Sequence, residues 1–267
     1  MGGRRLATWT DFRCLITGGS RGIGFAIADE LTRLGAQVVI VGRDPARVNA
    51  AARLLSDGRL GHATGLAVSI DGRETTAERL VEQALTTLGG LDGLVNAAGG
   101  ATVGHALTVP WDVWQRDVAT KFWGYFALMR AAAPVLQSPG GVMVNLVGVA
   151  GKDPNPRLAP GTVINGALRG LIKILADDLA PRGIRVLAVN PGATETDLLH
   201  EMAQGYARLN STTVEEALKG LKASGPLGRL PTAVDIAKAV VFLMSDDAAL
   251  ISGTSIDIDG GVHRGPA

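Results

Sequence analysis

The stretch Thr17-Gly18-Gly19-Ser20-Arg21-Gly22-Ile23-Gly24 decides the fold of this chain. It follows the apolar run 12–16 and precedes the helix-like run 25–34. A strand, a glycine-rich turn and a helix in this order are typical of a dinucleotide-binding unit. Glycines let the backbone turn sharply and approach a phosphate, and the amides that open the next helix can hold a pyrophosphate. We therefore expect this turn to bind a dinucleotide.

Composition sets the class of protein. The chain has 267 residues, 46% of them hydrophobic, and 36 glycines, which suits one α/β domain over residues 1–267 with a buried sheet and tight turns. A net charge of +1 gives no basic surface for nucleic acid. The single Cys14 forms no internal disulfide, and no apolar run has the length of a signal peptide or a membrane span. We expect a soluble cytoplasmic protein without a metal site.

Short apolar runs alternate with helix-like segments along the chain. Because several of the apolar runs are continuous in Val, Ile and Leu, they predict strands that are buried on both faces. The pattern predicts a doubly wound parallel sheet of the Rossmann type, with about seven strands and helices on both faces. Predicted strands are 13–17, 37–41, 63–68, 93–96, 141–147, 185–189 and 254–258, and predicted helices are 22–34, 45–56, 73–88, 110–136, 161–180 and 232–245. The polar stretch 197–225 interrupts this order after a strand, so we expect a substrate lid there.

Three further motifs support a specific resemblance. They are Asn96-Ala97-Ala98-Gly99, Asn190-Pro191-Gly192-Ala193-Thr194-Glu195-Thr196, and the tail from Ile251 to Gly261. With the glycine-rich turn, they resemble the short-chain dehydrogenase/reductase superfamily over essentially the whole chain. The resemblance implies a nicotinamide-dependent oxidoreductase acting on a small molecule, with a homotetramer as the usual assembly and a homodimer next. It also implies cofactor contacts from Asn96, Ala98, Gly99, Pro191, Gly192, Thr194 and Thr196.

The end of the second predicted strand bears on the choice of cofactor. NAD-specific members of the family carry an acidic side chain there, where this chain has Gly42 followed by Arg43. Arg21 lies inside the glycine-rich turn. Two guanidinium groups beside the adenosine ribose suit a 2′-phosphate, so we expect NADP(H) to be preferred over NAD(H). The alternative is that both arginines are ordinary surface residues.

The catalytic positions depart from the family. The resemblance implies a tetrad of Asn, Ser, Tyr and Lys, in which Tyr transfers the proton, Lys lowers its pKa, Ser orients the carbonyl group and Asn holds a water. Counting along the motifs places these four at Lys121, Gly148, Gly161 and Asn165. Neither of the two tyrosines, Tyr125 and Tyr206, is followed by Lys four residues later. The sequence therefore predicts that the tetrad is replaced.

Two of these replacements look reciprocal. The Asn position holds Lys121, and the Lys position holds Asn165. One hypothesis is that Lys121 reaches into the vacated space, keeps a positive charge beside the nicotinamide ribose, and orients or protonates a substrate oxygen. The alternative is two unrelated changes after selection was lost. Lys152 and Arg157 lie between the positions of Ser and Tyr, at Gly148 and Gly161. They either bind an anionic substrate or lie on the surface.

Three functions from different classes stay open. The first is an NADP(H)-dependent oxidoreductase with an altered proton-transfer apparatus, acting on an unknown carbonyl or alcohol. The second is a non-redox isomerase, dehydratase or cyclase that uses the space left by Gly148 and Gly161. The third is a catalytically silent NADP(H)-binding protein. Turnover with a change in nicotinamide absorbance indicates the first, turnover without it the second, and binding alone the third.

Overall fold

The computed structural model describes residues 9–138, 140–222 and 225–263. One sheet of seven parallel strands, in the order β3-β2-β1-β4-β5-β6-β7, forms its centre. The strands are β1 (Arg13–Thr17), β2 (Gln37–Gly42), β3 (His62–Ala67), β4 (Gly93–Asn96), β5 (Val142–Leu146), β6 (Arg185–Pro191) and β7 (Ser255–Ile258). The order reverses direction between β1 and β4, which is the switch point where such sheets bind ligands. The prediction of a doubly wound sheet is confirmed.

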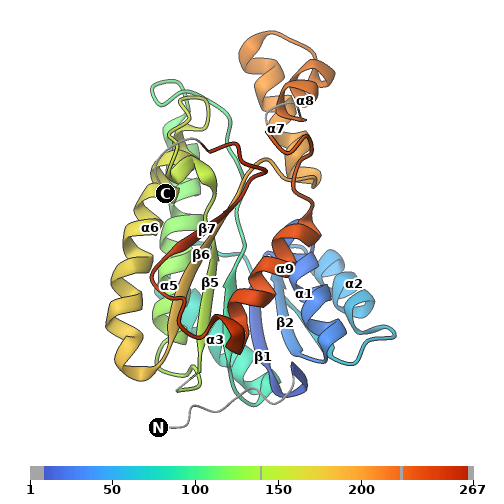
Figure 1. Ribbon diagram of the computed structural model, residues 1–267, viewed down its shortest axis with the longest axis vertical. Helices are drawn as coiled ribbons and strands as arrows, with labels where there is room; N and C mark the ends of the chain where they lie inside the picture. Colours follow the sequence, from blue (N-terminus) through green and yellow to red (C-terminus); the bar gives the residue numbers. More distant parts are fainter. Residues whose placement is uncertain (1–8, 139, 223–224, 264–267) are drawn as a thin grey trace.

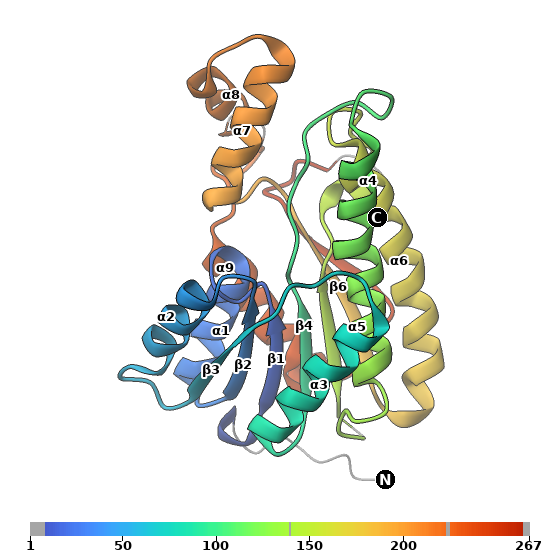
Figure 2. The same ribbon diagram turned by 180° about the vertical axis from the view of Figure 1, so that it is seen from behind.

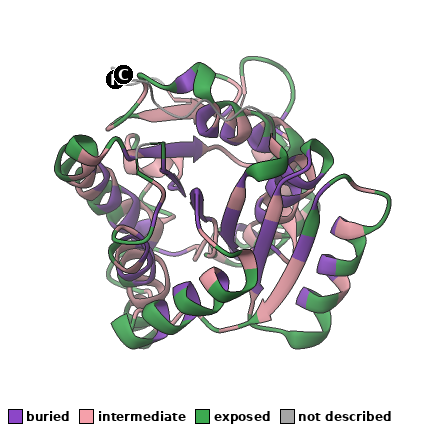
Figure 3. Cartoon of the chain, turned by 90° about the horizontal axis from the view of Figure 1, so that it is seen from below, coloured by how far each residue is buried: buried purple, intermediate pink, exposed green. Residues whose placement is uncertain are grey.

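Helices cover both faces of the sheet (Figures 1 and 2). On one face lie α1 (Gly22–Leu34), α2 (Pro45–Ser56) and α9 (Ala233–Met244), and on the other lie α3 (Glu74–Leu88), α5 (Gly124–Ala132) and α6 (Ala159–Leu179). Alternate residues of each strand serve the two layers: Cys14 and Ile16 face the first group of helices, and Leu15 faces the second. This two-sided burial explains the continuous apolar runs (Figure 3).

The predicted helix 110–136 is helical over residues 111–132 but is not a regular α-helix throughout. It consists of α4 (Trp111–Asp117), a π-helical segment (Val118–Trp123) and α5 (Gly124–Ala132). A π-helical turn holds an extra residue, so it changes the direction of the side chains that follow it. The segment carries Lys121, whose side chain reaches the segments that follow β4 and β5. The hydrophobic pattern alone predicted one regular helix and gave no sign of the π-helical turn.

Two short helices, α7 (Asp197–Asn210) and α8 (Val214–Lys222), form an arm above the carboxyl ends of the strands (Figures 1 and 2). They occupy the polar stretch 197–225, of which residues 223 and 224 lie outside the described part of the chain. The arm begins after β6 and returns before α9. Its base is closed by a parallel β-bridge between Glu195 and Thr232. Within the described ranges, no helix has the length and apolarity needed to cross a membrane.

Candidate functional site

The glycine-rich turn connects β1 to α1 at the switch point. Gly18 has φ +67° and Gly22 has φ +58°, conformations that L side chains rarely adopt. A Cβ atom on Gly24 would lie 2.4 Å from the Gly18 carbonyl oxygen, so the turn closes only because this residue is glycine. Helix α1 starts at Gly22, and no described side chain caps its first turn. Its first amides are therefore available to an anionic ligand, as a bound pyrophosphate requires.

The end of β4 meets this turn directly. The Thr17 hydroxyl accepts hydrogen bonds from the amides of Ala97 (3.0 Å) and Ala98 (3.2 Å). A Cβ atom on Gly18 would lie 2.8 Å from the Ala97 carbonyl oxygen, which again requires glycine. Asn96 is fully buried and its amide donates to Asn145 Oδ1 at 2.9 Å, so this side chain joins β4 to β5 from inside the sheet. The backbone of the loop that follows Asn96 borders the crevice.

The segment after β6 forms the opposite side of the crevice. The Thr194 hydroxyl donates to the Gly192 carbonyl oxygen at 2.9 Å, and the Thr196 hydroxyl donates to the Thr194 carbonyl oxygen at 3.3 Å. These local bonds fold the segment that begins at Pro191. The Thr196 methyl group lies 3.7 Å from where a Cβ atom on Gly22 would stand. The two predicted cofactor motifs, far apart in sequence, thus face each other.

At the end of β2, a side chain at position 42 would press against Ser20. A Cβ atom on Gly42 would lie 2.9 Å from the Ser20 hydroxyl oxygen. The next residue, Arg43, is exposed, and no described residue forms a hydrogen bond or an ion pair with it. Asp44 accepts a hydrogen bond from the Arg47 amide at 3.1 Å and thereby caps α2. Arg43 is therefore a cation without a partner among the described residues at this edge.

Arg21 points toward the arm. Its Nη1 atom lies 2.9 Å from Glu201 Oε1 and 3.7 Å from Asp197 Oδ2, both on α7. The sequence predicts a 2′-phosphate as the partner of Arg21 and gives no sign of these carboxylates. A sequence separation of 180 residues leaves no local signal for the contact with Glu201.

Lys121 lies beside the crevice on the π-helical segment. Its Nζ atom donates to the Val147 carbonyl oxygen at 2.7 Å, just past the end of β5. Its Cδ atom lies 3.5 Å from where a Cβ atom on Gly99 would stand. Burial lowers the pKa of Lys121 to about 8, against an opposing contribution from Asp117. The residue therefore brings an easily titrated ammonium group between the motifs that follow β4 and β5.

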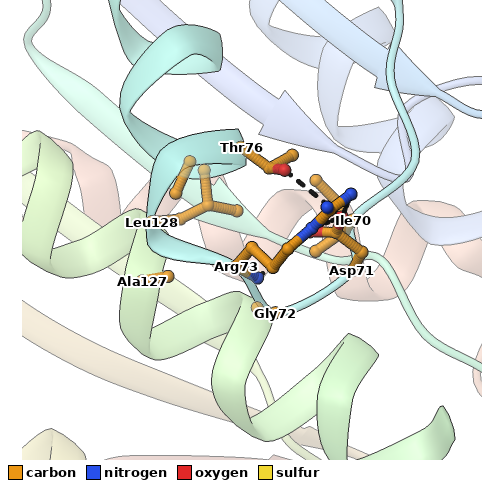
Figure 4. A pocket seen from close by; sticks show the side chains of 9 residues that line it. Ile70, Asp71, Gly72, Arg73, Thr76, Ala127 and Leu128 are labelled. Carbon is orange, nitrogen blue, oxygen red and sulfur yellow. Dashed lines mark hydrogen bonds and ion pairs between the residues drawn. The ribbon is translucent and has the colours of Figure 1, made fainter.

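The π-helical segment is held in place by the loop after β3. A Cβ atom on Gly72 would lie 2.5 Å from the Ala119 carbonyl oxygen, and one on Gly124 would lie 2.4 Å from Ile70 Cγ2. A cavity of about 10 Å³ remains between this loop, α3 and α5, close to the smallest space that holds one water (Figure 4). The two glycines thus allow a backbone contact that fixes the segment carrying Lys121.

Gly148, Asn165 and Gly161 have unequal surroundings. Gly148 has φ +121°, and a Cβ atom on it would lie 2.9 Å from Asn165 Nδ2. Asn165 also packs on Gly151, whose Cβ position is 2.8 Å from the Asn165 carbonyl carbon. The Asn165 Oδ1 atom is buried and has no partner among the described residues. At Gly161, in contrast, no described atom outside its chain neighbours and its own helix backbone lies within 4 Å of the Cβ position.

The two tyrosines lie elsewhere. Tyr125 is buried in the core, where its hydroxyl donates to the Leu146 carbonyl oxygen at 3.3 Å and burial raises its pKa. Tyr206 belongs to α7, and its hydroxyl accepts a hydrogen bond from Asn155 Nδ2 at 3.4 Å. Burial raises the pKa of Tyr206 as well. This contact joins the arm to the loop between β5 and α6.

Lys152 and Arg157 do not act together. Lys152 Nζ lies 2.9 Å from Asp257 Oδ2, and only 9% of its side chain is exposed, so it pairs inside the protein. Arg157 is exposed on the loop before α6. The idea of an anion grip by both residues therefore does not fit the structure. Asp257, whose partner role had no signal in the sequence, also accepts a hydrogen bond from Asn190 Nδ2 at 2.7 Å.

Within the described ranges, no group of three His, Cys, Asp or Glu residues suits a metal ion.

The sheet and its glycine-rich turn form a Rossmann-type fold, and comparison with known proteins places the chain in a family. Residues 18–263 match the family model described as enoyl-(acyl carrier protein) reductase. The chain is 36% identical to 2-(S)-hydroxypropyl-CoM dehydrogenase 3 of Xanthobacter autotrophicus, over 92% of this chain and 94% of that protein. The chain belongs to the short-chain dehydrogenase/reductase superfamily.

Solved structures agree with this assignment. A 3-ketoacyl-(acyl-carrier-protein) reductase from Brucella melitensis, complexed with NADH, is 32% identical with a TM-score of 0.81, covering 94% of this chain and 98% of that chain. A short-chain dehydrogenase from Burkholderia cenocepacia, in complex with NADP, is 29% identical with a TM-score of 0.82 and the same coverage. These relatives bind different nicotinamide cofactors.

Proposed function

We propose that this protein is an NADP(H)-dependent oxidoreductase acting on a carbonyl or alcohol group of a small molecule, with the usual catalytic tetrad replaced. The observation that carries the proposal is the position of Lys121. Its Nζ atom lies 2.7 Å from the Val147 carbonyl oxygen, and its Cδ atom lies 3.5 Å from where a Cβ atom on Gly99 would stand, so the side chain borders the segments that follow β4 and β5. No acidic side chain forms an ion pair with it among the described residues, so its charge is available to a ligand.

The residues around the crevice fit an NADP(H) cofactor. The open amides at the start of α1 suit the pyrophosphate, with Gly18, Ser20, Gly22, Ile23 and Gly24 forming the turn. Arg21 and Arg43 would hold the 2′-phosphate, since Gly42 carries no acidic side chain that would repel it. The nicotinamide end would lie against Ala98, Gly99, Pro191, Gly192, Thr194 and Thr196, with Asn96 supporting this edge from within. When bound, the cofactor supplies or accepts the hydride.

Lys121 is the proposed proton donor for carbonyl reduction. With a pKa of about 8 it is mostly protonated at neutral pH, yet it loses the proton more readily than an exposed lysine. The hydrogen bond to Val147 fixes the direction of the ammonium group while other N–H bonds remain for a substrate oxygen. Gly148 and Gly161 have no group that moves a proton, and Asn165 contributes at most a hydrogen bond. In this scheme the proton on the product oxygen comes from Lys121.

The test is a screen of carbonyl compounds with NADPH, followed at the nicotinamide absorbance band. For any active compound, we expect Lys121→Ala to lower kcat by about a hundredfold, the usual size of one acid–base contribution, with little change in NADPH affinity. Lys238→Ala is the control, because Lys238 is an exposed lysine on α9. Unchanged turnover in Lys121→Ala would remove this residue from the chemistry.

A second candidate is a silent NADP(H)-binding protein. The packing of Asn165 against Gly148 and Gly151 favours it, because this contact fills space beside the crevice with a side chain that cannot transfer a proton. Such a protein would bind NADPH and turn over none of the carbonyl compounds. A non-redox enzyme would instead convert its substrate without a change in nicotinamide absorbance.

The proposal extends to the arm and the assembly. The arm α7–α8 would act as the substrate lid, since Tyr206 contacts the loop between β5 and α6.

A homotetramer is proposed on the family resemblance, supported by Trp111 and Trp123, which are 74% and 49% exposed. A cytoplasmic location is part of the same proposal. Light scattering of the purified chain tests the assembly, and a Trp111→Glu variant should shift it toward smaller species.

A further inference from the structure

The contact between the glycine-rich turn and the arm has a consequence for cofactor choice. Arg21 Nη1 lies 2.9 Å from Glu201 Oε1 and 3.7 Å from Asp197 Oδ2. Thr196, the residue before α7, lies against Gly22 of the same turn. The carboxylates of the arm thus meet the guanidinium group that the proposed function assigns to the 2′-phosphate.

One guanidinium group cannot serve both partners well. A phosphate monoester carries about two negative charges at neutral pH, and each of the two carboxylates carries one more. If Arg21 held the phosphate while paired with Glu201, these anions would lie within a few ångströms of one another. Their repulsion, only partly screened by salt at this distance, opposes the joint arrangement. Competition for Arg21 is therefore favoured over a shared bridge.

Arg43 has no such competitor among the described residues, because it is exposed and forms neither a hydrogen bond nor an ion pair with them. The two arginines therefore differ: Arg43 is free to receive a phosphate, and Arg21 must first leave the arm. The side chains of Arg21 and Glu201 are 39% and 51% exposed, so the ion pair is weak enough to exchange.

We infer that Glu201, with Asp197 as a weaker partner, is a specificity-determining residue that competes with the 2′-phosphate of NADP(H) for Arg21. NAD(H) lacks this phosphate and is bound without displacing Glu201. Glu201 therefore lowers the preference for NADP(H) over NAD(H), and binding of NADP(H) removes one contact between the arm and the glycine-rich turn. This inference rests on the proposed role of Arg21 in cofactor binding.

The test is calorimetric titration of the full chain with NADPH and with NADH. An exposed ion pair contributes a factor of up to about five to an equilibrium constant, so Glu201→Gln should lower the Kd for NADPH about threefold to fivefold. The Kd for NADH should stay within a factor of about two, within the spread of surface substitutions. Asp197→Asn should act in the same direction with a smaller effect, because its oxygen is 3.7 Å from Arg21. Glu215→Gln, an exposed carboxylate on α8 of the same arm, is the matched control and should change neither Kd.

Arg21→Ala separates the two ideas. If Arg21→Ala weakens NADPH binding more than NADH binding, and Glu201→Gln has no further effect in the double variant, the role of Arg21 and the competition by Glu201 are both supported. If it weakens NADPH but Glu201→Gln leaves the Kd unchanged or raises it, the competition is refuted and the cofactor role of Arg21 stands. If Arg21→Ala leaves the ratio of the two affinities unchanged, the proposed role of Arg21 itself fails.

Discussion

Lys152 Nζ lies 2.9 Å from Asp257 Oδ2, which joins the segment after β5 to the last strand of the sheet. Both side chains are mostly withdrawn from water, with 9% and 22% of their surfaces exposed. Burial raises the pKa of Asp257, but hydrogen bonds from Asn190 and Lys152 lower it by more, so the net shift of the pKa is downward. The pair therefore stabilises the edge of the crevice that contains Pro191.

We expect Asp257→Asn to lower the free energy of unfolding by about 2 kcal/mol at neutral pH, because it leaves Lys152 without its counter-charge. Since the folded state holds the Asp257 pKa below its usual value, the contribution is present above the unfolded pKa and is lost as the pH falls through the folded pKa. The variant should therefore show less loss of stability in acid. Urea denaturation from neutral pH to about pH 3 measures this; Asp178→Asn, an exposed carboxylate on α6, should behave like the wild type.

The pKa of Lys121 gives a second prediction of the same direction, in a higher pH range. Its folded value is about 8 and its ordinary value is 10.5, so between these values the unfolded state binds more protons and stability rises with pH. Relative to Lys121→Met, the wild type should gain about 2 kcal/mol in the free energy of unfolding between about pH 7.5 and 9.5. Urea denaturation at the two pH values measures the gain. A Lys238→Met control should show no such change, and an equal response in both variants would mean that Lys121 is not buried as described.

Arg43→Ala tests the cofactor preference from the side of β2. We expect the Kd for NADPH to rise about tenfold and that for NADH to change little, because only the 2′-phosphate loses a charge-assisted hydrogen bond. Calorimetry with both cofactors gives the ratio. Arg47→Ala is the matched control, an exposed arginine one helical turn away in α2. A parallel loss for both cofactors would contradict the assignment.

Gly148→Ser places at position 148 the serine that the family resemblance implies there. The residue has φ +121° and its Cβ atom would meet Asn165 Nδ2 at 2.9 Å, so we expect a loss of about 2 kcal/mol in stability. Gly161→Ser should be neutral or slightly stabilising, because its Cβ position is open and it lies within α6. Urea denaturation of the two variants compares them directly. Equal stability would mean that Gly148 is under no strain.

Much of the fold was predictable from hydrophobic period and turn residues. The boundaries of α1 and α2 agree with the prediction, because Gly35 ends the first helix and Asp44 caps the second. The π-helical segment was not predictable, because it depends on contacts of Gly72 and Gly124 with residues distant in sequence. For the same reason, the sequence motifs indicated where a cofactor is proposed to bind but gave no sign of the pairs Arg21–Glu201 and Lys152–Asp257.

The base of the arm has one further consequence. Glu195 and Thr232 form a β-bridge, and the Glu195 amide donates to the Pro231 carbonyl oxygen at 2.9 Å. The two ends of the arm are thus hydrogen-bonded to each other where the arm leaves the sheet. A chain closed at its base can lengthen or shorten at little cost in loop entropy. The stretch 197–230 can therefore be replaced by a segment of different length while the ends of the strands below it keep their positions.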